Sequence, residues 1–132
     1  MSKESMMRFA DQMLSESAFL RDNCRDLEEY RDPEEPLPIS LLGYFGGEVA
    51  KQYDIIGLEE WRRLSDLIEQ GLASDDSDVG TAVATGFIEG LIHRAEAVEG
   101  RWPKIEVGLG SLARSYADAY RNADFTVKAQ EV

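Results

Sequence analysis

The chain has 132 residues, close to the usual size of one domain, so we expect a single helical domain over residues 1–132. Its 43% hydrophobic and 30% charged residues are typical of a globular protein and exclude disorder throughout the chain. The 26 acidic and 14 basic residues leave a net charge of −12, which makes nucleic acid and anionic membranes poor partners because both are polyanions.

Cysteine usage and the first residues favour a cytoplasmic protein. The single cysteine, Cys24, has no second thiol with which to form an internal disulfide, as is common in a reducing compartment. Charges are scattered through the first residues, which lack the apolar run of a signal peptide, and no stretch is apolar enough to cross a membrane. We therefore expect cytoplasmic localisation.

Residues 4–31 are predicted to form an N-terminal helical segment, either one long helix or two helices stacked end to end. Its apolar positions are spaced as on one face of a helix: Met6, Phe9, Met13, Leu20, Cys24 and Leu27. Residues 32–38 then contain three prolines, which remove amide donors and favour extended backbone. This stretch predicts an acidic, proline-rich linker.

Residues 39–122 are predicted to form the helical core. Its first helix contains Gly43, Gly46 and Gly47, and this density indicates either a close crossing of another backbone or a turn within the segment. The next helix follows Gly57 and has an apolar stripe formed by Trp61, Leu64, Ile68 and Leu72.

The second half of the core is predicted to contain two further helices. The oxygen-bearing side chains of residues 74–78 are typical of a helix start, because they accept hydrogen bonds from the first free amides. The last helix is expected from about Pro103 to Asn122, with Leu112 among its core positions. Residues 123–132 are expected to be a frayed tail.

Strand signals are absent from the sequence, because alternation at period two is never sustained and no Asn-Gly or Asp-Gly dipeptide occurs. The predicted fold is therefore all-α, with five or six helices in an irregular bundle or in stacked helical hairpins.

Catalytic and metal-binding patterns are not found, so we expect no catalytic residue, no metal and no cofactor. Counted from Asp75, an EF-hand loop would place Val79 and Gly86 at ligand positions, so helix capping explains the acidic cluster better. His93 is the only histidine and cannot build a zinc site with one distant cysteine. The adjacent Glu59 and Glu60 are interpreted as a solvated helix face.

The distribution of charge is the feature that points to a function. The acidic excess lies mainly in residues 22–35 and 75–99, and together these stretches could form one anionic patch that steers a basic protein. The candidate partner-binding residues are Asp22, Asp26, Glu28, Glu29, Glu34, Glu35, Asp75, Asp76 and Asp78.

Several short motifs follow one another along residues 32–120, and they punctuate helices rather than mark a catalytic site. They are Pro36-Leu37-Pro38, Leu42-Gly43, Trp61 with Leu67-Ile68-Glu69, Asp76 to Val79, Phe87-Ile88-Glu89-Gly90-Leu91, and Gly100 with Pro103-Lys104. Their order resembles a group of small, acidic, all-helical bacterial domains that occur among polymorphic-toxin immunity proteins. The resemblance implies a helical domain that neutralises a toxin by covering it.

The leading hypothesis is a non-catalytic immunity protein whose carboxylates block the basic active site of a nuclease-like toxin. One alternative is another acidic adaptor or an inhibitor that mimics nucleic acid. A small metal-dependent hydrolase that uses residues 75–78 is another. The last alternative is a homodimer with a seam through Met6, Phe9 and Met13, because methionines adapt well to such contacts.

Overall fold

The architecture is that of a computed structural model, which describes the backbone of residues 2–24 and 38–131 and the side chains of residues 4–24 and 38–123. Within these ranges the regular elements are all helices and no strand occurs, which confirms the all-α prediction. The helices outnumber the five or six expected, because Ser17 and the Gly108–Gly110 connection divide segments that the sequence presents as continuous. No helix in this part of the chain combines the length and apolar character that a membrane span requires.

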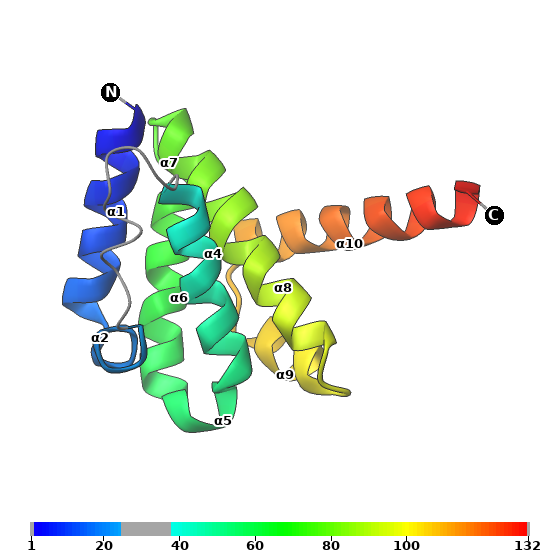
Figure 1. The fold of residues 1–132 in the computed structure, drawn as a ribbon, viewed down its shortest axis with the longest axis horizontal. Coiled ribbons are helices and arrows are strands. Elements are labelled where there is room, and N and C mark those ends of the chain that lie inside the picture. Colours follow the sequence, from blue (N-terminus) through cyan, green and yellow to red (C-terminus); the bar gives the residue numbers. More distant parts are fainter. Residues whose placement is uncertain (1, 25–37, 132) are drawn as a thin grey trace.

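The N-terminal segment consists of α1 (Ser2–Glu16) and α2 (Ala18–Asn23). Ser17 has extended backbone, and its Oγ accepts a hydrogen bond of 3.1 Å from the amide of Leu20, so a new helix starts there. Figure 1 shows α2 lying across the lower end of α1 rather than continuing its axis. The part of the predicted segment beyond Cys24 lies outside the described residues.

The helix α4 (Pro38–Lys51) begins at the residue that the sequence assigns to the end of the linker. A proline is tolerated at the first position of a helix, since its missing N–H has no partner there. Residues 32–37 of the predicted linker lie outside the described part.

A short helix, α5 (Tyr53–Ile56), leads into α6 (Leu58–Leu72). Gly57 separates them with a φ of 86°, a left-handed value that favours glycine. The predicted apolar stripe of α6 is confirmed in its buried Trp61, Leu64 and Ile68. Leu72 at its end is half-buried.

The helices α7 (Ser77–Thr81), η1 (Ala82–Ile88) and α8 (Glu89–Glu96) form one continuous rod, called here the long helix. The backbone at both junctions stays in the right-handed helical region, and η1 is a stretch of wider π-helix. Such widened turns are uncommon and accommodate local packing demands.

The predicted last helix is two helices, α9 (Arg101–Val107) and α10 (Ser111–Glu131), with Gly108 and Gly110 in the connection. Leu112, expected in the core, has 46% of its surface exposed because α10 begins at the edge of the body. The α10 backbone remains helical beyond Asn122 through most of the predicted tail, and the helix projects away from the bundle (Figure 1).

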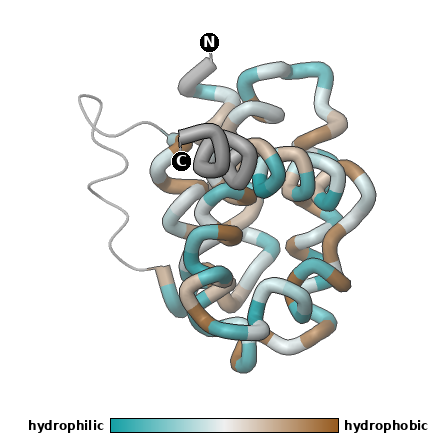
Figure 2. The backbone as a smooth tube through the Cα atoms, turned by 90° about the vertical axis from the view of Figure 1, so that its right-hand side faces the viewer, coloured by the Kyte–Doolittle hydropathy of each residue, from teal (hydrophilic) through white to brown (hydrophobic). Residues whose placement is uncertain are grey.

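The bundle packs α1, α4, α6 and the long helix side by side. In Figure 1, α1, α4 and the long helix run in the same direction, whereas α6 runs in the opposite one. Figure 2, turned by 90° from the view of Figure 1, shows hydrophobic and hydrophilic stretches alternating along the helices, as expected where one face of each helix is buried. The core includes the fully buried side chains of Phe45, Trp61 and Phe87.

The backbones of α4 and the long helix are in direct contact through glycines. A Cβ atom added to Gly86 would lie 2.6 Å from the carbonyl oxygen of Ile39, and one added to Gly90 would overlap the backbone of Gly43. A Cβ atom at Gly46 would overlap the carbonyl oxygen of Phe87. Of the two explanations that the sequence left open for these glycines, the close crossing is therefore confirmed.

We expect Gly46→Ala to lower the free energy of unfolding by about 1–3 kcal/mol, because the two backbones must separate to admit the methyl group. Gly80→Ala is the matched control, because its Cβ atom would meet no atom closer than 3.8 Å. This control should gain roughly 0.5–1 kcal/mol, the usual benefit of alanine over glycine in a helix. Urea unfolding followed by circular dichroism measures both changes, and equal effects of the two substitutions would contradict the close contact.

Candidate functional site

The acidic turn, defined here as residues 74–78, joins α6 to the long helix. Asp76 is the N-cap of α7, and its Oδ1 accepts hydrogen bonds from the amides of Asp78 at 2.9 Å and Val79 at 3.4 Å. The Ser74 hydroxyl accepts a hydrogen bond from the amide of Asp76 at 3.0 Å. These bonds fix the turn and confirm the prediction that the cluster starts a helix.

Asp76 also connects the turn to α1. A hydrogen bond from the Ser5 hydroxyl, together with the amides of Asp78 and Val79, holds the pKa of the Asp76 carboxyl below its ordinary value, because each donor stabilises the charged form. Asp75 is exposed and Asp78 is half-buried. The turn therefore uses one carboxylate for its own structure and presents the other two at its surface.

The remaining candidate residues do not join the acidic turn within the described part of the chain. Asp22 is exposed on α2, at the far end of α1 from Ser5, and the α-helical rise puts roughly 17 Å between Ser5 and Glu16. Five candidates lie outside the described residues, namely Asp26, Glu28, Glu29, Glu34 and Glu35. The helix α2, which carries Asp22, and the start of α7, which follows the acidic turn, lie at opposite ends of the bundle (Figure 1).

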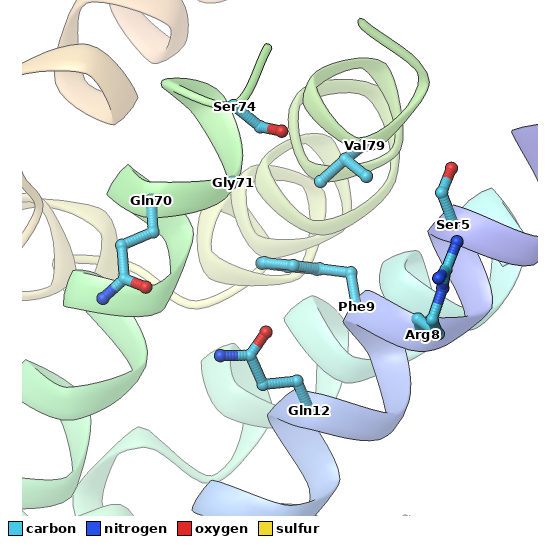
Figure 3. A pocket seen from close by; sticks show the side chains of 8 residues that line it. All are labelled: Ser5, Arg8, Phe9, Gln12, Gln70, Gly71, Ser74 and Val79. Carbon is cyan, nitrogen blue, oxygen red and sulfur yellow. The ribbon is translucent and has the colours of Figure 1, made fainter. Parts of the chain in front are cut away.

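A pocket of about 290 Å³ opens beneath the acidic turn, between α1 and the end of α6. Its floor is apolar, and Figure 3 shows the Phe9 side chain crossing the middle of the pocket. Polar side chains from both helices surround it. The lining residues are Ser5, Arg8, Phe9, Gln12, Gln70, Gly71, Ser74 and Val79.

This pocket combines side chains that are distant in the sequence, which distinguishes it from two other hollows of 320 and 310 Å³. One of these is lined only by residues 56–63, and the other by Glu106, Val107 and Arg114. The acidic turn borders the 290 Å³ pocket directly, since its Ser74 lines the pocket, as does the adjacent Val79. We therefore regard the acidic turn and this pocket together as the candidate site.

Two carboxylates of α6 have roles that the sequence interpretation missed. The Glu60 carboxylate accepts hydrogen bonds from the Ser17 hydroxyl at 2.7 Å and the Phe19 amide at 2.6 Å, so it caps α2. Glu60 is consequently half-buried and does not belong to a solvated face, whereas Glu59 is exposed as predicted.

Glu69 caps α10 in the same way. Its carboxylate accepts hydrogen bonds from the amides of Leu112 at 3.0 Å and Ala113 at 2.8 Å. Negative charge is favourable at the N-terminal end of a helix because the free amides and the helix dipole are positive there.

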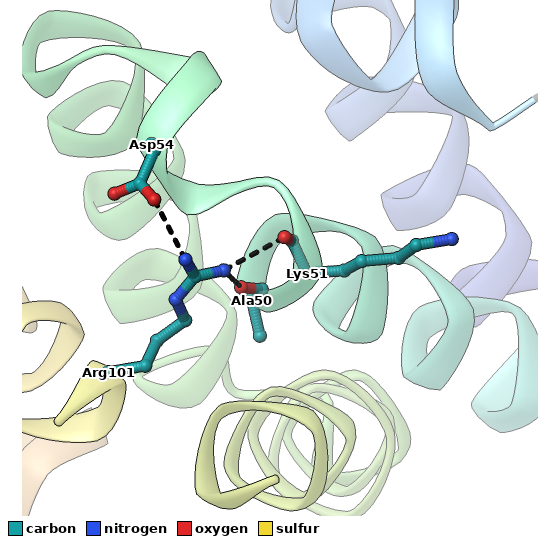
Figure 4. Close-up of polar contacts among 4 residues, drawn as sticks. All are labelled: Ala50, Lys51, Asp54 and Arg101. Carbon is teal, nitrogen blue, oxygen red and sulfur yellow. Dashed lines mark hydrogen bonds and ion pairs between the residues drawn. The ribbon is translucent and has the colours of Figure 1, made fainter. Parts of the chain in front are cut away.

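Arginines cap helix C-termini by donating hydrogen bonds to free carbonyl oxygens, as the two glutamates cap helix N-termini by accepting hydrogen bonds from free amides. Figure 4 shows the Arg101 guanidinium donating to the carbonyl oxygens of Ala50 at 2.7 Å and Lys51 at 2.8 Å, while also pairing with Asp54 at 2.8 Å. Arg21 donates to the carbonyl oxygens of the last turn of α1 at 2.8 Å. Positive charge at the carbonyl end of a helix is stabilising.

A row of polar pairs joins α8 to α10. The Tyr116 hydroxyl donates to Glu89 at 2.6 Å, the His93 Nε2 and the Tyr120 hydroxyl are hydrogen bonded at 2.8 Å, and Arg121 donates to Glu96 at 3.0 Å. Burial and the Glu89 carboxylate raise the pKa of the Tyr116 hydroxyl to about 12. This row holds α10 on the body and uses the single histidine at its surface.

The side chains proposed for a homodimer seam lie inside the monomer. Met6 and Phe9 are each 8% exposed and Met13 is fully buried, because their face of α1 packs against the bundle core. A seam through these three residues is therefore wrong for this fold. Cys24 is buried as well. Desolvation is the main cause that raises the pKa of its thiol to about 12, and repulsion from the Glu48 carboxylate adds to it.

Within the described residues, no group of three or more His, Cys, Asp or Glu side chains is placed to hold a metal ion. Comparisons with protein-family models, with curated proteins and with solved structures found no match to this chain.

Replacing Glu60 with alanine should lower the free energy of unfolding by about 1–3 kcal/mol, because two partly buried donors lose their acceptor. Glu59→Ala provides the control, since it removes the same charge from the same turn of α6 at an exposed position. Chemical denaturation measures the difference. A loss of stability that is equal in both variants would show that charge near the helix start matters, and not the cap on α2.

Stability should fall as the pH rises from about 9 toward 12. The pKa of Cys24 rises from 9.0 to about 12, and that of Tyr116 from 10.0 to about 12, so the unfolded chain loses these protons first and is favoured by alkali. Urea unfolding at a series of pH values measures the slope. The double variant Cys24→Ala/Tyr116→Phe should show a shallower slope, and a slope equal to that of the wild type would contradict this assignment.

Proposed function

We propose that this chain is a non-catalytic protein-binding module that presents the acidic turn to a basic protein. The observation that carries the proposal is the position of Asp75 and Asp78, which lie at the surface of a turn fixed by the Asp76 cap and bordering the 290 Å³ pocket. Concave surfaces that carry a few polar groups are common binding sites in proteins.

The net charge of −12 supports an electrostatic mode of association. A strong negative field raises the rate at which a basic partner arrives and disfavours acidic competitors, and salt weakens both effects. Blocking of a basic active site would follow directly, because carboxylates at the interface replace the phosphates of an anionic substrate. No bond is made or broken in this mechanism.

The resemblance to immunity-associated domains supplies the class of partner in this proposal. A toxin domain with a basic, nuclease-like active site fits the sign of the acidic turn, and both proteins would meet in the cytoplasm. The contact surface proposed here is narrower than the sequence suggests, because Asp22 lies at the opposite end of the bundle from the turn. We therefore assign the contact to Asp75 and Asp78, with Asp76 as their support.

The test is affinity capture from the native host at low and high salt, followed by titration calorimetry with the purified partner. We expect a basic protein whose affinity falls by about tenfold or more in the variant Asp75→Lys/Asp78→Lys. The control Glu59→Lys/Asp66→Lys changes the net charge equally at exposed positions of α6 and should bind nearly as well as the wild type. An acidic partner, or an affinity that is insensitive to salt and to the reversal at the turn, would refute the proposal.

A further inference from the structure

We propose that the 290 Å³ pocket binds a small monocarboxylic acid with an apolar body, a ligand that is independent of the protein partner proposed above. The pocket opens where the first turns of α1 meet the last turn of α6 and the start of the long helix (Figure 3). Its described lining has three parts, which are one cation, an apolar floor and a set of uncharged polar side chains. Each part accounts for one feature of the ligand.

Arg8 supplies the charge of the pocket, and every other described lining residue is uncharged. It is exposed on α1 and stands beside Ser5 at the α1 side of the pocket (Figure 3). Its guanidinium forms no ion pair or hydrogen bond with the described part of the chain, whereas Arg101 is held by the carbonyl oxygens of α4. The planar fork of a free arginine matches the two oxygens of a carboxylate, so the ligand carries a carboxylate at this side.

The floor of the pocket selects an apolar body. Phe9 and Val79 are each 8% exposed, and the Phe9 ring crosses the middle of the pocket (Figure 3). The ring lies against the backbone of α6, because a Cβ atom added to Gly71 would lie 2.8 Å from the Phe9 Cζ atom. An aromatic ring packs well on another ring in an offset or edge-to-face arrangement, so a flat, apolar body suits this floor.

Uncharged hydrogen-bonding groups occupy the side of the pocket away from Arg8. The Gln70 side chain is exposed and forms no hydrogen bond with the described part of the chain. The Ser74 oxygen accepts from the amide of Asp76 at 3.0 Å, which leaves its hydroxyl proton for another acceptor. Gln12 donates to Glu16 through its Nε2 at 3.0 Å, which leaves its carbonyl oxygen as an acceptor. These groups suit a neutral hydroxyl or amide at the far end of the ligand.

Size and surrounding charge limit the ligand to a small anion with a single charge. Binding pockets usually span about 300–1,000 Å³, and this one lies just below that range. An anion approaches against the net charge of −12, and the acidic turn next to the pocket opposes every further negative charge. A phosphate or a dicarboxylate is therefore disfavoured, and a cation would meet Arg8 inside the pocket.

The probe is 4-hydroxyphenylacetate, which has a carboxylate, a flat apolar body and a distant hydroxyl group. It is titrated into the full chain and followed by two-dimensional NMR. We expect shift changes centred on Phe9, Gln12 and Gln70. Two analogues of the same shape, the neutral 4-hydroxyphenylacetamide and the cationic tyramine, should bind about tenfold more weakly or worse, because each lacks the carboxylate. Equal binding of either analogue, or the absence of shifts at the pocket, would overturn the inference.

Two variants locate the ends of the ligand. Arg8→Gln should weaken binding of 4-hydroxyphenylacetate by about tenfold or more. The matched control Arg62→Gln removes the same charge at an exposed site on α6 and should leave binding unchanged. Gln70→Leu should reduce the preference for 4-hydroxyphenylacetate over phenylacetate, which lacks the hydroxyl group. Circular dichroism verifies that each variant folds.

Affinity that is unchanged in Arg8→Gln, or lowered equally in the control Arg62→Gln, would refute the carboxylate site. The titrations contain no protein partner, so they test the pocket whether or not the acidic turn binds a basic protein. Failure of the carboxylate to bind leaves the proposed function standing, and failure to capture a basic partner leaves the pocket standing.

Discussion

The contact between the backbones of α4 and the long helix is the constraint on which the rest of the fold depends. A Cβ atom on Gly46 would overlap the backbone of Phe87, and Cβ atoms on Gly86 and Gly90 would crowd the backbone of α4 at Ile39 and Gly43. Such an approach fixes the relative height of the two helices, because bulkier neighbours on either side prevent them from sliding past each other. The other helices then pack against a pair whose geometry is already set.

Charged side chains complete the assembly by capping helices that belong to other parts of the chain. Glu60 and Glu69 on α6 accept hydrogen bonds from free amides of α2 and α10, and Arg101 on α9 donates hydrogen bonds to free carbonyl oxygens of α4. Each pairing satisfies backbone groups that would otherwise depend on water, and each has the sign that the helix dipole favours. A substantial part of the charge of this protein is therefore structural, so its net charge overstates the surface available to a partner.

The features visible in the sequence are those determined by near neighbours. Helical spacing predicted the buried stripe of α6, and oxygen-bearing side chains predicted the helix start at Asp76. Glycine density indicated either a close crossing of α4 or a turn, and the structure has the crossing. The role of Glu60 depends on α2, which is 41 residues away from it, and no local pattern reveals that proximity. The expected dimer seam on α1 failed for the same reason, because a stripe of methionine and phenylalanine suits an interior face and an interface equally well.

The acidic turn is suited to recognition because the helices that hold it in place are rigid. It begins the long helix, whose later part is held against α4 by the glycine contacts, and Asp76 links it to α1 through Ser5. Association orders flexible groups at a cost in free energy, so carboxylates on a turn that is already fixed lose less entropy when a partner binds. The same cap that starts the helix thus orients Asp75 and Asp78, and the packing of the bundle determines where the negative charge is presented.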